Sequence, residues 1–180
     1  MNIAVIFAGG VGSRMHSKQK PKQFLEMYNK PIIIHTIEYF ENHPSIDAIV
    51  VVCVEDWIPY FEKLLYKFRI EKVKKVVPGG ATGQLSIYNG LKAAETIAGS
   101  ERAIVLIHDG VRPCVVPSVI DDVIAATKEK GAAVTCTPLF ETPIHSAGGE
   151  YIEEIPVRDE CYTAQAPQSF KFGQVLEAYD

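Results

Sequence analysis

Residues 3–15 read IAVIFAGGVGSRM: a short apolar run passes directly into a loop that has glycine at three of four successive positions. The run Ile3–Phe7 is apolar on both faces, which is typical of a buried strand in a parallel sheet. Comparable runs, one of them interrupted by two lysines, recur at residues 48–54, 73–77, 103–108 and 132–137. Together these runs predict the strands of one central sheet.

Amphipathic stretches separate the predicted strands. Apolar residues at spacings of three and four predict helices over residues 31–40, 57–68, 86–98 and 118–130. Ser86 is expected to cap the third helix at its N-terminus, and Gly131 to end the fourth. Strands that alternate with helices predict an α/β fold, a doubly wound and mostly parallel sheet with right-handed crossovers. Ligands bind such sheets beyond the C-terminal strand ends, so the loops 8–22, 78–84 and 109–117 should share one edge.

A segment at about residues 138–160 breaks the alternation. Two extended stretches flank Gly148 and Gly149, which predicts a β-hairpin that projects from the sheet as an arm. Because an isolated hairpin is only marginally stable in water, we expect the arm to pack against a second copy of the chain in a homodimer. The length predicts a single domain over residues 1–180, and the sequence ends inside a helix expected to begin near Gly173.

Composition narrows the function classes. The chain has 18 basic and 22 acidic residues and a formal net charge of −4, which excludes a strongly basic nucleic-acid-binding protein. No apolar run approaches the roughly 20 residues needed to cross a bilayer, and the N-terminus has no signal-peptide pattern. The four cysteines are scattered without a C-x-x-C pair, which favours reduced thiols in the cytoplasm. We therefore expect a cytoplasmic protein whose partners are neither nucleic acids nor membranes.

The first glycine loop carries the strongest chemical signal. Its three glycines, within residues 9–12, let backbone N–H groups approach an anion closely, and Arg14 and Lys22 add positive charge. Residues 14–30 hold five basic residues against one acidic residue. This combination predicts a cradle for a polyphosphate. It is neither a Walker A loop nor a dinucleotide fingerprint, since Met15 stands where the third glycine of that fingerprint belongs. The alternative is a solvated, lysine-rich loop.

The end of the strand predicted over 103–108 carries the sequence HDGVRP at residues 108–113. Asp109 would face the polyphosphate loop and is well placed to hold Mg²⁺ (or Mn²⁺), while Arg112 could bind a second phosphate. The alternative is that Asp109 caps a turn and pairs with Arg112. His108 is expected to be a packed, hydrogen-bonded side chain rather than a general base.

Two further stretches give weaker signals. The glycine loop at residues 79–86 joins a predicted strand to a predicted helix and could read the edge of a base; the alternative is an ordinary connection. Arg158 lies near the end of the arm, where it is either an anion-binding residue or a surface arginine.

Taken together, these motifs resemble the cytidylyltransferases that act on 2-C-methyl-D-erythritol 4-phosphate and on ribitol 5-phosphate. The resemblance covers essentially the whole chain and rests on residues 9–15, 21–24, 108–113 and 167–168. At residues 8–14, 32–38 and 167–170 the sequence resembles the ribitol-phosphate enzymes more than the methylerythritol-phosphate enzymes. The resemblance implies a Rossmann-like nucleotide-diphospho-sugar transferase fold.

The resemblance also implies an activity. The chain would join CMP from CTP to a polyol phosphate, most specifically D-ribitol 5-phosphate, and give CDP-ribitol and pyrophosphate. The nearest alternative is the methylerythritol phosphate reaction of isoprenoid synthesis, or another nucleotide or sugar phosphate on the same fold. An alternative from another class is a CTP-binding or interaction module that no longer turns over.

By the same resemblance, roles pass to individual residues. The triphosphate would be held by Ala8, Gly9, Gly10, Gly12 and the catalytic residues Arg14 and Lys22, and the cytosine by Gly80 and Ser86. Asp109 would hold the metal, and the alcohol phosphate would be approached by Arg112, Thr142 and Arg158. Thr142 and Arg158 would reach across from the arm of a partner subunit.

The sequence departs from the family pattern at three places. Thr82 and Gly83 stand where the family has an acidic residue followed by an arginine, and Ala166 stands where it has a threonine. The last strand of the family, with a lysine and a second metal-binding aspartate, would lie beyond Asp180, so the chain is expected to be a fragment.

Overall fold

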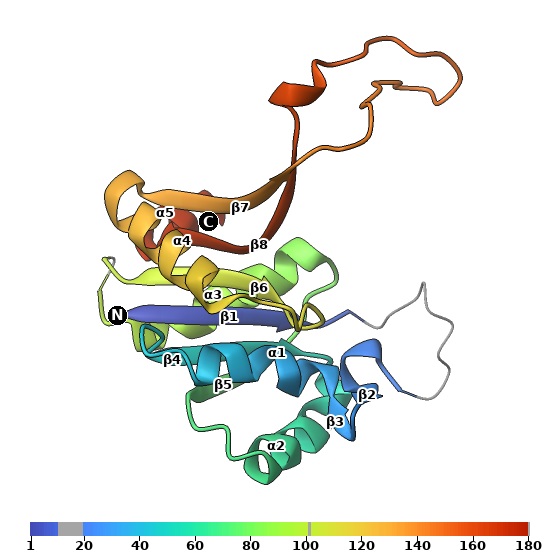
Figure 1. Ribbon diagram of the computed structural model, residues 1–180. Helices are drawn as coiled ribbons and strands as arrows, with labels where there is room; N and C mark the ends of the chain where they lie inside the picture. The colour runs from blue at the N-terminus through green and yellow to red at the C-terminus, as the bar shows by residue number, and fades with distance from the viewer. Residues whose placement is uncertain (11–19, 101, 180) are drawn as a thin grey trace.

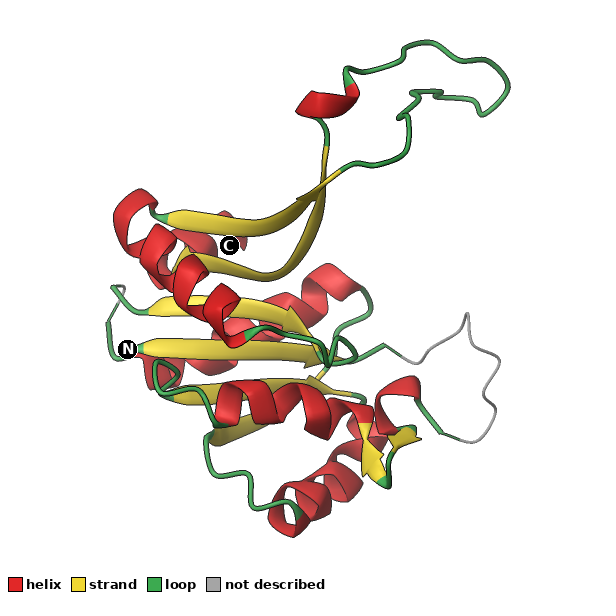
Figure 2. Ribbon diagram, viewed as in Figure 1, coloured by secondary structure: helices red, strands yellow, loops and turns green. Residues whose placement is uncertain are grey.

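A six-stranded sheet with helices on both faces forms the centre of the computed structural model, which describes residues 1–10, 20–100 and 102–179 (Figures 1 and 2). Its strands are β1 (Asn2–Ala8), β4 (Ala48–Cys53), β5 (Val73–Pro78), β6 (Ile104–Asp109), β7 (Ala132–Pro138) and β8 (Tyr162–Lys171). The helices are α1 (Ile32–Glu41), α2 (Ile58–Lys67), α3 (Gly83–Ala98), α4 (Pro117–Lys130) and α5 (Phe172–Tyr179). The smaller elements are the strand pair β2 (Glu26–Met27) and β3 (Lys30–Pro31) and the 3₁₀ turns η2 (Lys22–Phe24), η3 (Glu55–Trp57) and η4 (Arg158–Glu160).

The strand order β5-β4-β1-β6-β8-β7 confirms the predicted doubly wound sheet. β1 pairs in parallel with β4 and β6, and β4 pairs in parallel with β5. Each predicted strand is present within a residue or two of its expected bounds. α1 and α2 lie on one face of the sheet and α3 on the other, as expected for right-handed connections that run outward from β1 to β5 and then back across β1 to β6 (Figure 1).

β8 is a strand that the sequence does not predict. It runs antiparallel between β6 and β7, with a register irregularity between Val134 and Cys136 of its partner strand. Its sequence YTAQAPQSFK is polar and contains a proline, which removes a backbone donor from the ladder. Ser169, one of its buried residues, lies with its hydroxyl 2.6 Å from that of Thr127 on α4. β8 therefore docks partly through polar contacts, which the apolar periodicity of the sequence cannot reveal.

The core consists of two layers, one on each face of β1. Ala4 and Ile6 pack toward α1, α2 and α4, whereas Ile3 and Val5 pack toward α3 and α5. All four of these side chains are fully buried. Full burial of a valine or isoleucine contributes about 1.5–3 kcal/mol, so β1 is held firmly from both sides.

Two helix termini test the predicted caps. α3 begins at Gly83 and not at Ser86, and its N-cap is Thr82, whose side chain accepts a hydrogen bond from the backbone N–H of Leu85. The prediction that Ser86 is the cap is therefore wrong, because Thr82 caps the helix four positions earlier and the Ser86 hydroxyl bonds within the glycine loop instead. Gly131 does end α4, with a φ of +95°, as predicted. Within the part of the chain that the structure describes, no helix combines the length and apolarity that a membrane span requires.

The segment between β7 and β8 projects away from the sheet, as predicted for the arm (Figure 1). It is not the ladder of a β-hairpin, because its one bridge beyond the two strands joins His145 to Glu154. Pro143 and Pro156 each lack a backbone donor, which interrupts pairing on both sides of the turn. The turn does fall at Gly149, whose φ is +76°. Large apolar side chains are exposed along the arm at Phe140, Ile144, Tyr151, Ile152, Ile155 and Val157.

Close packing of α3 on the sheet gives a test of the fold. A Cβ at Gly90 would lie 2.5 Å from Cγ1 of Val5 and 2.9 Å from Cγ2 of Val52. Alanine improves helix propensity by up to about 1 kcal/mol, but overpacking of this kind costs about 1–3 kcal/mol. We expect Gly90→Ala to lower the free energy of unfolding by about 1–2 kcal/mol in urea denaturation.

The control for this experiment is Gly83→Ala in the same helix, where an added Cβ meets no atom within 4 Å. This variant should be neutral or slightly stabilising. Equal effects of the two variants would contradict the close approach of α3 to β1 and β4.

Candidate active site

A cavity of about 380 Å³ lies at the C-terminal ends of β1, β5 and β6, at the edge where the sequence predicts the functional loops to meet. It is lined by Phe7, Ala8, Gly9, Gly10, Lys22, Gln23, Gly80, Ala81, Thr82, Gly83, Ser86, Asp109 and Val111. Seven of the predicted site residues are thus brought together: Ala8, Gly9, Gly10, Lys22, Gly80, Ser86 and Asp109. Gly12 and Arg14 lie outside the described residues. The structure therefore confirms the prediction that three loops from distant parts of the chain meet at one edge of the sheet.

The two glycine loops touch backbone to backbone. A Cβ at Gly9 would lie 3.1 Å from the Cα of Gly79 and 3.3 Å from Oγ of Ser86, so a side chain at position 9 would push the loops apart. The buried Ser86 hydroxyl accepts a hydrogen bond from the N–H of Gly80 (3.0 Å) and donates to the carbonyl of Thr82 (2.9 Å). Ser86 therefore fixes the shape of the second glycine loop, whatever the loop binds.

Lys22 reaches the cavity because the segment around it is anchored by an aromatic cluster. Phe24, two residues later, is fully buried and stacks on Trp57 with ring centroids 5.2 Å apart. It also meets Tyr60 edge-on at 5.5 Å. Among the described residues, Lys22 has no ion-pair partner, whereas the neighbouring Lys20 bonds the Tyr60 hydroxyl and lies 3.6 Å from Glu26. The hydrogen bond to Tyr60 raises the pKa of Lys20. Lys22 is thus the cation that this segment presents to the cavity.

Asp109 and Arg112 form an ion pair. On the sequence alone, this pair is the alternative to a role for Asp109 as a metal ligand. Nε of Arg112 lies 2.5 Å from Oδ2 of Asp109, and its Nη1 donates to Oε1 of Gln165 (2.8 Å). Arg112 does not line the cavity, while Asp109 lines it and pairs with Arg112 at once. His108 is buried, as predicted, with Nε2 3.1 Å from the carbonyl of Arg112. Burial lowers the pKa of His108, so the neutral imidazole is favoured.

The carboxylate of Asp109 fits a divalent cation only together with a ligand. Among the described residues, no group of three or more His, Cys, Asp and Glu side chains could hold a metal ion. Mg²⁺ commonly binds to one or two carboxylates plus substrate phosphates and water, and it does not need a cage made of protein alone. A single carboxylate beside a polyphosphate site matches that donor set.

Thr142 and Arg158 are not brought to this cavity. Both are exposed on the arm, and Nε of Arg158 lies 3.6 Å from the carboxylate of its neighbour Asp159. A single copy of the chain therefore does not assemble the substrate site that the resemblance implies for them. Whether they approach the site of a second copy stays a prediction.

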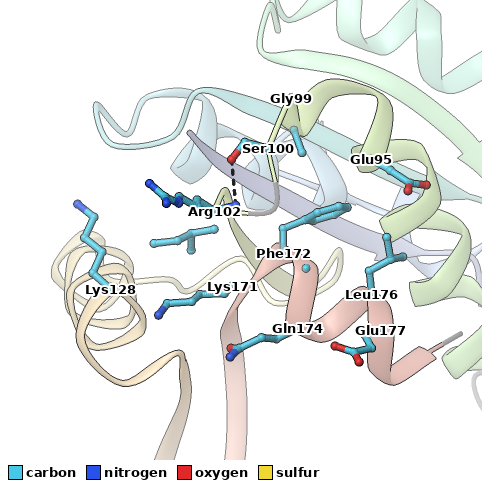
Figure 3. A pocket seen from close by; sticks show the side chains of 13 residues that line it. Glu95, Gly99, Ser100, Arg102, Lys128, Lys171, Phe172, Gln174, Leu176 and Glu177 are labelled. Atoms are coloured by element: carbon cyan, nitrogen blue, oxygen red, sulfur yellow. Dashed lines mark hydrogen bonds between the residues drawn. The ribbon is translucent and has the colours of Figure 1, made fainter.

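A second cavity, of about 990 Å³, lies elsewhere, between α3, α4 and α5 (Figure 3). It opens at the start of β6 and the end of β8, which is the opposite end of β6 from Asp109. Arg102, Lys128 and Lys171 line it together with two glutamates, but none of the predicted site residues does. The smaller cavity is the candidate active site because the glycine loops, Lys22 and Asp109 meet there.

The sequence missed Gln23 as a residue of the site. Its side chain is buried under the first glycine loop, where Nε2 donates to the carbonyl of Ala8 (2.6 Å). The signal available was its place between Lys22 and Phe24, inside the motif at residues 21–24.

Comparison with known families gives one consistent result. A family model described as 2-C-methyl-D-erythritol 4-phosphate cytidylyltransferase (IspD) matches residues 2–180. A ribitol-5-phosphate cytidylyltransferase of Streptococcus agalactiae serotype Ia is 52% identical over 98% of this chain and 73% of its own length. One from Vibrio parahaemolyticus is 51% identical over 99% of this chain and 75% of its own. A 2-C-methyl-D-erythritol 4-phosphate cytidylyltransferase of Clostridium botulinum (strain Okra) is 39% identical over 99% and 76%.

Solved structures agree with this result. The 4-diphosphocytidyl-2C-methyl-D-erythritol synthase of Anaerococcus prevotii superposes with a TM-score of 0.81 at 27% identity, over 99% of this chain and 73% of that one. The 2-C-methyl-D-erythritol 4-phosphate cytidylyltransferase of Francisella tularensis gives 0.79 at 27% identity, over 99% and 76%. These likenesses confirm the predicted fold class.

Proposed function

We propose that this chain, which belongs to the 2-C-methyl-D-erythritol 4-phosphate cytidylyltransferase family, transfers CMP from CTP to D-ribitol 5-phosphate and releases pyrophosphate. Membership of the family makes it a CTP-dependent nucleotidyltransferase. The choice of ribitol phosphate rests on the relatives at 51–52% identity, which carry that name, against 39% for the methylerythritol relative above. The meeting of both glycine loops, Lys22 and Asp109 in one cavity is the structural observation that supports it.

The cavity suits a nucleoside triphosphate. We assign the backbone of Ala8, Gly9 and Gly10 and the ammonium of Lys22 to the triphosphate, and Gly80 and Ser86 to the base. Gly12 and Arg14 complete the triphosphate site in this proposal. Phosphate oxygens are bound by backbone N–H groups in glycine turns and by lysine ammonium groups. Lys22 is available for this role, because among the described residues the ion pair to Glu26 is made by Lys20 and not by Lys22.

The reaction needs no general base. The nucleophile is the phosphate monoester of the acceptor, and the second pKa of such a group is about 6, so it is already an anion at pH 7. This agrees with the burial of His108 away from solvent. The barrier lies in bringing two anions together at the α-phosphate while pyrophosphate departs. Lys22 and Arg14 neutralise that charge, and each such preorganised group is worth about 3–4 kcal/mol.

Asp109 would hold a Mg²⁺ ion together with the phosphates of CTP. When bound, the cation supplies charge neutralisation at the α-phosphate and the leaving group. Arg112 orients the Asp109 carboxylate through their 2.5 Å ion pair. In this role the aspartate is a ligand, since a bare carboxylate beside a triphosphate would only repel it.

A homodimer would complete the acceptor site. In this proposal Thr142 and Arg158 of one arm reach the acceptor phosphate near Arg112 of the partner copy. The exposed large apolar side chains along the arm support it, because burial against a second copy would remove them from water. The four free cysteines support a location in the reducing cytoplasm, where CTP is made.

The acceptor is tested by a substrate panel. Wild-type protein with CTP, Mg²⁺ and equal concentrations of D-ribitol 5-phosphate, 2-C-methyl-D-erythritol 4-phosphate and other polyol phosphates is assayed for pyrophosphate. We expect the highest kcat/KM with D-ribitol 5-phosphate. A higher kcat/KM with 2-C-methyl-D-erythritol 4-phosphate would show that this compound, and not D-ribitol 5-phosphate, is the acceptor. CTP binding without pyrophosphate release would identify the chain as a binding module instead.

Loss of a phosphate-binding cation should slow the reaction and leave the fold intact. We expect Lys22→Ala and Arg14→Ala each to lower kcat/KM at least about tenfold, since each removes one preorganised charge. Lys63→Ala, on the exposed surface of α2, is the matched control and should keep the wild-type rate. A folded Lys22→Ala variant with a near-normal rate would refute the assignment of Lys22 to the triphosphate.

Two measurements distinguish a role of Asp109 as a metal ligand from a role as a turn cap. Activity should vanish with a chelator and return with Mg²⁺ or Mn²⁺. Asp109→Asn should keep the fold because it is nearly isosteric, but it should bind metal–CTP poorly and turn over slowly. Asparagine caps turns about as well as aspartate, so an unchanged rate and Mg²⁺ dependence would identify Asp109 as a cap.

The dimer is tested by sedimentation. We expect a two-copy species at micromolar concentration, and Ile155→Asp together with Val157→Asp should shift it toward the monomer because both side chains are exposed on the arm. A clean monomer of the wild-type chain at the same concentration would contradict the dimer.

A further inference from the structure

We propose that Gln23 and His108 are positioning residues for the reaction, and that each fixes one loop of the site through a single hydrogen bond to a backbone carbonyl. The proposal rests on the proposed function and extends it to Gln23, which lines the cavity, and to His108, which lies outside its lining. Neither side chain is assigned to a substrate; both act through the loops above them.

Gln23 lies under the first glycine loop. The residue is 1% exposed, and its Nε2 donates to the carbonyl of Ala8 at 2.6 Å. Ala8 is the last residue of β1, and Gly9 and Gly10 follow it directly. The amide of Gln23 therefore sets the direction in which the chain leaves the sheet. Its other polar atom, Oε1, is buried without a hydrogen-bond partner.

His108 occupies the corresponding place under the third loop. It is 1% exposed and packs against the ring of Phe40, with centroids 5.1 Å apart. Its Nε2 lies 3.1 Å from the carbonyl of Arg112. A carbonyl can only accept, so Nε2 carries the proton and donates, and Nδ1 is a bare acceptor. Nδ1 is also buried without a partner.

These two atoms stand out in the molecule. Over residues 1–10, 20–100 and 102–179, Oε1 of Gln23 and Nδ1 of His108 are the buried side-chain atoms that lack a hydrogen-bond partner. A buried acceptor without a donor is costly, and an apolar side chain of similar shape would avoid that cost. Stability alone therefore does not account for an amide at position 23 or an imidazole at position 108. What each supplies is the donor that holds the loop.

The two loops carry different parts of the reaction. Ala8, Gly9 and Gly10 line the nucleotide side of the cavity. Arg112 closes the turn that begins at Asp109, since its N–H donates to the carbonyl of Asp109 at 3.2 Å. Preorganised binding groups must be held to within about half an ångström to act fully. Loss of the Gln23 donor should therefore affect CTP, and loss of the His108 donor should affect the metal and the acceptor.

The test uses variants that keep the shape and remove the donor. Gln23→Met and His108→Leu lose the hydrogen bond. Gln23→Glu is isosteric and, assayed at a pH where its carboxyl is ionised, sets an acceptor against the Ala8 carbonyl. His108→Gln keeps a donor near the position of Nε2. For each variant, pyrophosphate release is measured with CTP, acceptor and Mg²⁺ varied separately, and the thermal midpoint is measured without ligand. Thr127→Val removes a buried hydrogen bond far from the cavity and is the control.

We expect Gln23→Met to raise the KM for CTP at least tenfold, with the KM for the acceptor within twofold and the thermal midpoint unchanged or higher. Gln23→Glu should be worse. His108→Leu should lower kcat at least tenfold and raise the Mg²⁺ concentration for half-maximal rate, and His108→Gln should recover most of the loss. Thr127→Val should lower the thermal midpoint and leave both KM values unchanged.

Two results would overturn the proposal. Kinetic constants within twofold of wild type in Gln23→Met and His108→Leu would show that the loops hold themselves. A lower thermal midpoint with both KM values altered together, as for any destabilised protein, would reduce both residues to structural roles. If Gln23→Met does not fold, Gln23→Glu decides by the same criteria. A wild-type protein without pyrophosphate release contradicts the proposed function instead, and CTP affinity of wild type and Gln23→Met then still decides the role of Gln23.

Discussion

Burial of β1 on both faces is the constraint on which the rest of the structure depends. Ile3, Ala4, Val5 and Ile6 are inaccessible to solvent, and their burial holds the strand in the centre of the sheet. The apolar run ends at Ala8, so the chain must leave the sheet there. Because β4 and β6 run parallel to β1, with Ala8 opposite Cys53 and Phe7 opposite Asp109, their ends meet the first glycine loop at one edge. The parallel register therefore brings the loops of the site together independently of any polar contact between them.

Apolar periodicity was sufficient to predict most of the fold. Strands that are buried on both faces leave an unbroken apolar run, and helices over one face leave spacings of three and four, so β1, β4, β6 and the helices could be read directly. β8 could not, because it docks by register and by contacts such as Thr127 to Ser169, which have no apolar signature. The arm projects as expected, but prolines at 143 and 156 remove the donors that a hairpin ladder would need.

From the sequence it was possible to predict which loops meet at the candidate site. The order of glycines, lysine and strand-end aspartate places Gly9, Gly80, Lys22 and Asp109 at the same edge, and the structure brings them together. Side-chain pairing was not predictable to the same degree. The i, i+3 spacing of Asp109 and Arg112 allows an ion pair but does not require one, and the buried partners of loop carbonyls have no pattern in a single sequence. The role of Gln23 therefore follows from its place in the cavity wall and its 2.6 Å contact with Ala8.

Electrostatics explains how an acidic protein can serve two anionic substrates. The net charge of −4 belongs to the chain as a whole, whereas residues 14–30 are locally basic, and at physiological ionic strength the field of an exposed charge is screened beyond about 8 Å. In the proposed site, a phosphate would therefore respond to the local arrangement: the partly buried Lys22, the backbone of the first glycine loop, and an aspartate that is paired with Arg112. The pairing of Asp109 with Arg112 matters for such a site, because an unpaired carboxylate at that edge would repel phosphate groups.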